Sequence, residues 1–199
     1  RLFDLVRIAS ISADGAYHAE CEKAARWLVV ELTALGFAAE ARPTAGKPMV
    51  VAHYAPRNAA PDCPHVLFYG HYDVQPVDPL ELWHSPPFEP RRAKGADGIE
   101  RLYGRGCADD KGQLMTFVEA ARAWIAVSGD LPFRATFLIE GEEESGSPSL
   151  VPFLQQNREE LACDVAFICD TNMWDAKTPA ITTRLRGLVA EMGGLAEVA

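Results

Sequence analysis

Apolar positions along the chain recur with two spacings, one typical of helices and the other of strands. Helical spacing and helix start signals predict helices over 2–8, 17–35, 111–127 and 147–161. Apolar runs bounded by turn residues predict strands over 37–42, 49–54, 66–69, 133–139, 165–169 and 181–189. Strands that alternate with helices in this way place the chain in the α/β class.

Glycine and proline residues mark where several of these elements begin and end. Gly36 is placed to cap the helix that ends near residue 35, and Pro148 stands at the first position of the last helix. The turn over 43–46 predicts a hairpin between the first two strands. Residues 55–64 are rich in Pro, Asn and Asp, so we expect a surface loop there.

Composition narrows the class of protein. With 199 residues, of which 48% are hydrophobic, the chain can bury the core of one globular domain. A net charge of −9 argues against a nucleic-acid partner, because such proteins need a basic face. No apolar run approaches the roughly 20 residues that span a bilayer, and no leader opens the chain, so we expect a cytoplasmic protein with no membrane partner. Because the chain begins at Arg1 without a Met, we also expect residues upstream.

The cysteines do not suggest a disulfide framework or a thiolate metal site. The five cysteines are odd in number, widely spaced and outside any CxxC pattern. Cys107 and Cys169 stand beside acidic motifs, but we interpret each as a small buried filler and not as a nucleophile. A reducing compartment fits this usage best.

Four stretches rich in acidic residues or histidine carry the candidate chemistry. Three follow predicted strands and one precedes the helix over 111–127; they are 71–73, 142–144, 169–170 and 108–112. The carboxyl ends of strands in open α/β sheets meet at one edge, where clefts form. Carboxylates and imidazoles suit zinc, and a catalytic zinc takes ligands from several elements. The four stretches together therefore predict one metal site.

Each stretch alone has a simpler interpretation. A single His at a strand end, or a run of Glu, is usually a solvated turn, and Asp109 or Asp110 alone would be an N-cap. The helix that follows Asp109 favours its ionised form, because the unpaired N–H groups at a helix N-terminus stabilise an anion. The segment 76–90 holds five prolines, too many for a central strand or a helix, so we expect an ordered loop over the site.

The motifs, in their order along the chain, resemble those of the zinc-dependent exopeptidases of the M20 metallopeptidase family. The family includes carnosinase-like dipeptidases, carboxypeptidase G, acetylornithine deacetylase and succinyl-diaminopimelate desuccinylase. The match extends from about residue 1 to 188 and looks most like the dipeptidase branch. Its specific pieces are 70–76, Trp83 with 87–90, 102–106 running into 109–112, 140–147 and 185–187.

The resemblance implies a two-zinc centre, with Mn or Co as possible substitutes. Asp109 would bridge both ions, His71 and Asp170 would complete one, and Glu144 would belong to the other. Glu143 would be the general base, taking a proton from water and passing it to the leaving amine.

The motif residues next to these ligands take lesser roles. Asp73 resembles the carboxylate that orients the ligating imidazole. Glu142 has no assigned role, and we interpret it as solvated. The family also tends to have a cis peptide after the bridging Asp, here Asp109–Asp110.

The resemblance also implies a fold and a domain arrangement. We expect a mixed, mostly parallel central sheet flanked by helices, with residues 1–190 as the N-terminal part of a metallopeptidase catalytic domain. The tail 191–199 would stand where a lid domain starts, through which the parent protein would form a homodimer. We expect the lid to lie outside this chain. We expect the same of a late His that would complete the second zinc, because none of the other histidines matches that ligand. This leaves the activity of the isolated chain open.

Three functional hypotheses compete. The first is metal-dependent hydrolysis of a peptide or amide bond in a dipeptide or an N-acyl amino acid. The second is a non-catalytic metal-binding module that keeps the fold and holds at most one ion through His71, Asp109 and Asp170. A calcium-binding or structural acidic module is disfavoured, because His71 is a poor calcium ligand and no DxDxDG pattern appears. A dinucleotide fold is also disfavoured, because the third glycine is missing after Gly104 and Gly106.

Overall fold

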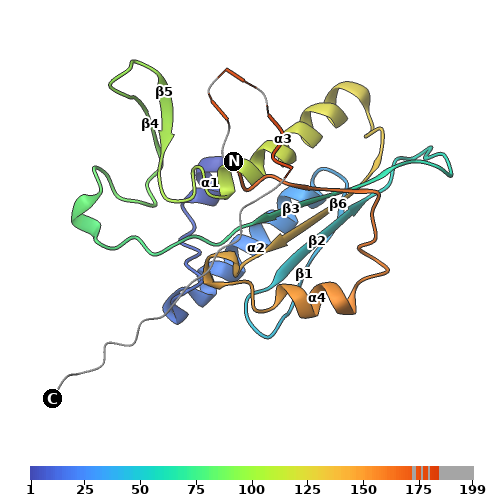
Figure 1. Cartoon of the computed structure of the whole chain (residues 1–199), viewed down its shortest axis with the longest axis horizontal. Helices are drawn as coiled ribbons and strands as arrows, with labels where there is room; N and C mark the ends of the chain where they lie inside the picture. The colour runs from blue at the N-terminus through green and yellow to red at the C-terminus, as the bar shows by residue number, and fades with distance from the viewer. Residues whose placement is uncertain (172–173, 176, 179, 184–199) are drawn as a thin grey trace.

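The computed structural model describes residues 1–171, 174–175, 177–178 and 180–183 (Figure 1). Its helices are α1 (Leu2–Val6), α2 (His18–Thr33), α3 (Lys111–Ser128) and α4 (Leu150–Gln156), with 3-10 turns η1 (Gly15–Tyr17), η2 (Leu80–Leu82) and η3 (Glu143–Ser145). Its strands are β1 (Ala38–Arg42), β2 (Met49–Tyr54), β3 (His65–His71), β4 (Arg91–Lys94), β5 (Glu100–Tyr103), β6 (Arg134–Glu140) and β7 (Val165–Ile168).

A five-stranded sheet with the order β1-β2-β6-β3-β7 forms the centre of the molecule. Strand β3 pairs in parallel with β6 and β7, whereas β2 is antiparallel to both of its neighbours. Four of the five strands therefore point the same way, which confirms the predicted mixed, mostly parallel sheet. The register places His71 opposite Glu140, so β3 and β6 end side by side.

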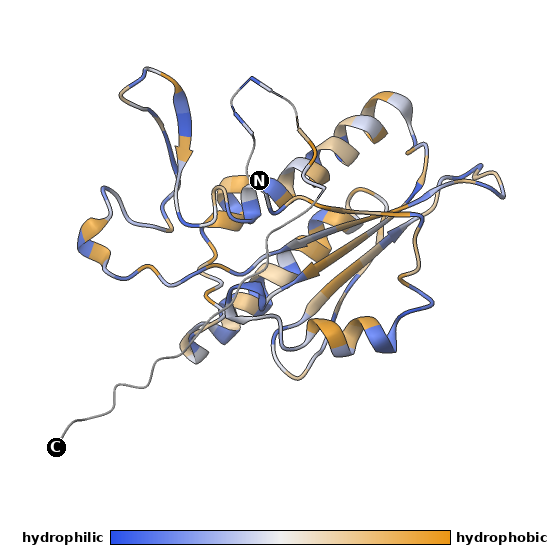
Figure 2. Ribbon diagram, viewed as in Figure 1, coloured by the Kyte–Doolittle hydropathy of each residue, from blue (hydrophilic) through white to orange (hydrophobic). Residues whose placement is uncertain are grey.

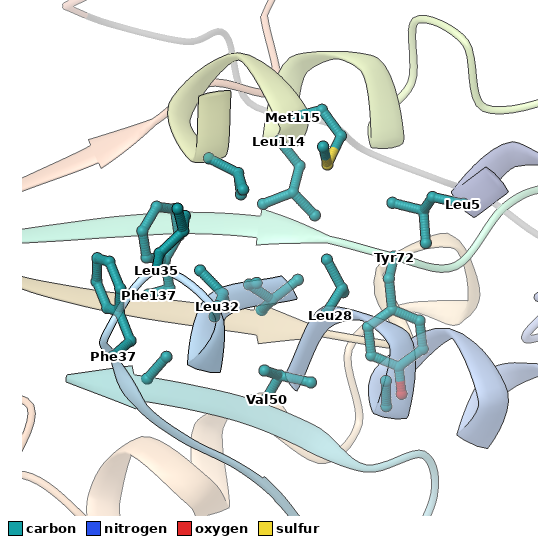
Figure 3. Packing of buried hydrophobic residues seen from close by; sticks show 14 of the residues in the cluster. Leu5, Leu28, Leu32, Leu35, Phe37, Val50, Tyr72, Leu114, Met115 and Phe137 are labelled. Carbon is teal, nitrogen blue, oxygen red and sulfur yellow. The ribbon is translucent and has the colours of Figure 1, made fainter. Parts of the chain in front are cut away.

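The larger core lies between one face of the sheet and the helices α1, α2 and α3 (Figure 3). Val50 of β2 and Phe137 of β6 pack there with Leu28 of α2 and Leu114 of α3. Helix α2 buries the same stripe that its sequence pattern predicts, and Gly36 follows it with a φ of 91°, a conformation that glycine adopts without strain.

The opposite face of the sheet packs against α4. Met49 and Val51 alternate with Val50 along β2, so they face the other side of the sheet and pack with Phe153 of α4. Figure 2 shows the hydrophobic colour concentrated on these central strands. In the described part of the chain, no helix combines the length and the apolar character needed to cross a membrane.

Two predictions about elements need correction. The helix predicted over 147–161 spans only Leu150–Gln156, because Ser147 has a left-handed φ of 51° and Asn157 leaves the helical region with a ψ of 22°. The hairpin of β4 and β5 was not predicted, because its strands are short and mostly polar and carry no apolar run; Figure 1 shows it projecting from the central sheet.

The end of the chain lies beyond the structural description. Residues 184–189 of the predicted last strand lie outside the described residues. The 185–187 motif and the tail 191–199 also lie outside them.

Candidate metal centre

Three parallel strands and one helix bring the predicted site residues to the same edge of the sheet. His71 is the last residue of β3, Glu143 lies in the turn η3 that follows β6, and Asp170 comes two residues after β7. Asp109 stands two residues before the start of α3. Because β3, β6 and β7 are parallel and adjacent, their carboxyl ends meet at this edge, as the sequence predicts.

The imidazole of His71 faces three carboxylates. Its Nε2 atom lies 3.1 Å from Asp109 Oδ1, 3.6 Å from Asp170 Oδ2 and 3.8 Å from Glu143 Oε2. One ligand atom each from His71, Glu143 and Asp170 lie within 4.8 Å of one another. This donor set of one imidazole and several carboxylates fits zinc and similar divalent ions.

Asp73 ties His71 to the glutamate turn. The Nδ1 atom of His71 lies 3.1 Å from the main-chain oxygen of Asp73 and 3.2 Å from its Oδ1. The two oxygens of the same carboxylate accept the main-chain N–H groups of Glu143 (3.2 Å) and Glu144 (3.1 Å). The fully buried Asp73 thus has the contacts expected of a carboxylate that orients an imidazole, and it also anchors η3.

The surroundings of His71 favour a positive charge at its ring. Burial alone would lower the pKa of His71, but the hydrogen bond to Asp73 and the charges of Asp73, Asp110 and Glu143 raise it to about 10. An imidazole that faces carboxylates in this way retains a proton when no other cation is near. A divalent ion at the same place would take over the role of that proton, because metal binding releases protons from its ligands.

Glu143 and Glu144 point to different partners. Glu143 lies with His71 and Asp170, whereas the Glu144 carboxylate accepts a 2.6 Å hydrogen bond from Gln75 and lies outside that group. Burial raises the pKa of both carboxyl groups above their usual range. The assignment of Glu144 to a second ion and of Glu143 as base remains a prediction.

The segment before α3 contains the cis peptide Asp109–Asp110 that the family resemblance suggests. The Asp109 side chain is 62% exposed, so it is open to solvent although it contacts His71. Asp110 is fully buried and accepts the main-chain N–H of His71 at 3.0 Å. Burial raises the pKa of Asp110 to about 7.

The structure differs from the sequence predictions at two buried residues near the site, Asp110 and Glu142. The sequence suggests a helix cap at Asp110, whereas its side chain accepts the main-chain N–H of His71; its adjacency to Asp109 is the only sequence signal for this contact. Glu142, interpreted as solvated, is only 7% exposed, so that interpretation is wrong. Its carboxylate packs under the turn between β1 and β2, where a side chain at Gly46 would collide with it.

Comparisons with known sequences agree with the motifs. Residues 67–188 match the family described as Peptidase family M20/M25/M40. The chain is 37% identical over 124 residues to the human Beta-Ala-His dipeptidase, a match that covers 61% of this chain and 24% of that protein. It is 32% identical over 200 residues to the Cys-Gly metallodipeptidase dug1 of Schizosaccharomyces pombe, covering 94% and 40%.

Solved structures show the same arrangement of elements. Human carnosine dipeptidase 1 superposes with a TM-score of 0.76 and 29% identity, covering 87% of this chain and 38% of that chain. The M20 family metallo-carboxypeptidase Sso-CP2 from Sulfolobus solfataricus has a TM-score of 0.72 and 33% identity, covering 84% and 36%. The chain thus spans at most about two fifths of the length of these relatives.

Proposed function

The chain belongs to peptidase family M20/M25/M40, and from this premise we propose that the full-length protein hydrolyses a peptide or amide bond in a dipeptide or an N-acyl amino acid. The relatives named as dipeptidases support the choice of a small peptide substrate. Residues 1–190 would then form the N-terminal part of the catalytic domain.

One observation carries the proposal: a buried imidazole, His71, faces the carboxylates of Asp109, Glu143 and Asp170 at the carboxyl edge of the sheet. In this proposal His71, Asp109, Asp170 and Glu144 hold two divalent ions, zinc by preference and Mn or Co as substitutes. When bound, such ions would polarise the scissile carbonyl and acidify the attacking water.

The residues of the chain would divide the remaining work. Glu143 would accept a proton from the attacking water and deliver it to the leaving amine. The raised pKa that burial gives Glu143 suits such a base, because proton transfer is most efficient when the pKa lies near the working pH. Asp73 would keep the His71 ring in place through the contact at Nδ1.

A second candidate is a non-catalytic module that binds one ion. The position of Glu144 favours it, because the Glu144 carboxylate is hydrogen-bonded to Gln75 and lies apart from the group formed by His71, Glu143 and Asp170. That group by itself offers ligands for a single ion.

Metal content and turnover of the full-length protein separate the two candidates. The protein is dialysed against Zn or Mn, its metal content is measured by elemental analysis, and hydrolysis of a dipeptide panel is assayed. Two ions with metal-dependent turnover support the exopeptidase. One ion without turnover supports the binding module, and neither metal nor turnover contradicts both.

A further inference from the structure

Two residues of the glutamate motif, Glu140 and Ser147, have no part in the proposed chemistry, but their side chains are hydrogen-bonded to each other. They flank the turn that carries Glu143 and Glu144. The hydroxyl of Ser147 donates a 2.9 Å hydrogen bond to Glu140 Oε1, which closes the segment 140–147 into a loop. Glu140 is only 1% exposed, so its carboxylate is shielded from water, whereas Ser147 is half-buried.

A third residue fixes this closure to the sheet. Tyr69 of β3 donates its hydroxyl hydrogen to the same Glu140 Oε1 atom from the neighbouring parallel strand. Tyr69 packs against the core cluster on the α4 face, so its ring has little freedom to move away. Hydrogen bonds to a buried carboxylate are favourable, and Glu140 Oε1 accepts one from each of these two hydroxyl groups.

The backbone of Ser147 is held in an unfavourable conformation. Its φ of 51° lies in the left-handed region, which residues with a side chain rarely adopt. The main-chain N–H of Ser147 donates to the carbonyl of Glu142 at 2.8 Å, so the chain turns back on itself directly beside the two functional glutamates. Glycine would adopt this conformation without strain, but serine does not. The hydrogen bond from Ser147 to Glu140 therefore helps to hold the backbone in this conformation.

We propose that Glu140, Tyr69 and Ser147 form a clamp that holds the turn bearing Glu143 and Glu144 against His71, as positioning residues and not as catalytic ones. This inference rests on the proposed function for its effect on turnover. The clamp and Asp73 hold the turn from two sides, because Asp73 accepts the N–H groups of Glu143 and Glu144. Loss of the clamp would let both carboxylates drift, and small displacements of reacting groups are costly for rate.

Amide hydrogen exchange on the full-length protein tests the clamp without reference to activity. In Ser147→Ala the amides of Glu143 and Glu144 should exchange about tenfold faster, as expected for the loss of one hydrogen bond to a buried carboxylate. Amides in the middle of β6 should keep their wild-type rates. Ser145→Ala is the matched control, because the Ser145 hydroxyl donates to the carbonyl of Glu142 and, among the described residues, has no hydrogen bond to the clamp.

Three further variants separate positioning from general stability. Ser147→Gly removes the hydroxyl but suits the left-handed φ, so it should unfold at a higher temperature than Ser147→Ala and still show fast exchange in the turn. Tyr69→Phe should behave like Ser147→Ala. Glu140→Gln keeps an acceptor oxygen, so the amides of Glu143 and Glu144 should largely retain their wild-type protection from exchange. In the metal-loaded enzyme, kcat should fall about tenfold in Ser147→Ala with little change in KM.

Unchanged exchange at Glu143 and Glu144 in both Ser147→Ala and Tyr69→Phe would overturn the clamp. Failure of the proposed function looks different: the wild-type protein would neither bind metal nor hydrolyse dipeptides, while the exchange experiment would still report on the clamp. If turnover is present in the wild type and unaffected in all clamp variants, the clamp inference fails and the proposed function stands.

Discussion

The adjacent residues Glu143 and Glu144 in η3 have different proposed roles, one as general base and the other as metal ligand, and substitution of Glu143 tests this division. Replacing Glu143 with Gln removes the proton acceptor and retains the shape of the side chain, so kcat should fall by about 10²–10⁴-fold. Metal content, measured by elemental analysis, should stay near that of the wild type, because the proposed ligands are all retained.

The neighbouring Glu142 supplies the control for this experiment. Its carboxylate packs under the turn at Gly46, away from His71, so Glu142→Gln should leave turnover close to that of the wild type. Loss of metal together with activity in Glu143→Gln would instead assign Glu143 as a ligand. The proximity of Glu143 Oε2 to His71 Nε2, 3.8 Å, makes this a real alternative.

At this scale the sequence could identify residue types but not where each side chain points. His71 and Asp170 could be placed together because parallel strands end at one edge, and Asp109 could be added because it stands just before a helix N-terminus. The directions of Glu142, Glu143 and Glu144 depend on the φ and ψ angles of η3 and on Asp73, which binds two N–H groups of that turn across 70 and 71 residues of chain. Long-range contacts of this kind leave no local pattern, which is why Glu142 was misinterpreted.

Helix α1 is attached to the start of α3 through one buried lysine. Lys111 is fully buried, and its Nζ atom donates to the carbonyls of Leu5 (3.1 Å) and Ile8 (2.7 Å). Lys111→Met keeps most of the side-chain volume but leaves these carbonyls without a donor, which should lower the free energy of unfolding by about 1–3 kcal/mol. Urea denaturation measures the change.

A surface lysine serves as the comparison for this variant. Lys23 on α2 is 56% exposed and, within the part of the chain that the structure describes, its only ion pair is with Glu20, so Lys23→Met should change the free energy of unfolding by less than about 0.5 kcal/mol. Equal effects of the two substitutions would show that the buried attachment of α1 contributes little.

The contact between β1, β2 and the segment after α4 should depend on pH. Arg42 holds Glu160 through two hydrogen bonds of 2.6 and 2.7 Å, and His53 adds a third at 2.8 Å. The hydrogen bonds from Arg42, followed by that from His53, lower the pKa of Glu160 to about 2. The contribution to stability is therefore fully present above the unfolded pKa of about 4.3 and is lost as the pH falls towards 2.

Glu160→Gln should flatten the dependence of the free energy of unfolding on pH between about 4.3 and 2. Because the Glu160 side chain is 38% exposed, solvent screening limits the effect to about 1 kcal/mol or less. Glu159→Gln is the matched control, since Glu159 is exposed and its carboxylate has no hydrogen-bond partner within the described residues. Identical pH profiles for both variants would contradict this role for Glu160.

Elements with a strong apolar period could be predicted, and those without one could not. Helices α2 and α3 and strands β2, β3 and β6 bury apolar side chains, so their patterns were visible in the sequence. The β4–β5 hairpin is built mostly from exposed polar residues, and its two strands pair with each other. Helix α4 is shorter than predicted because Ser147 has a left-handed φ before its start and Asn157 leaves the helical region at its end, and residue type alone does not determine these angles.

At the scale of the whole molecule, negative charge is concentrated where a cation would bind. The chain carries 28 acidic residues against 19 Lys and Arg, and Asp109, Glu143 and Asp170 converge on a single imidazole. Carboxylates held this close repel one another, which destabilises the folded state unless a cation lies between them. Metal binding should therefore stabilise the folded protein as well as support its chemistry.

Zinc should raise the thermal unfolding temperature of the full-length protein after treatment with a chelator. At a free concentration of 100 times Kd, an ion that binds only the folded state contributes about 2.7 kcal/mol, which corresponds to several degrees in Tm. Calcium should have little effect because an imidazole is a poor ligand for it. Asp170→Asn, which removes one carboxylate of the group without changing its size, should reduce the zinc-induced shift measured by calorimetry. A shift of equal size in this variant would mean that zinc stabilises the protein from a different site.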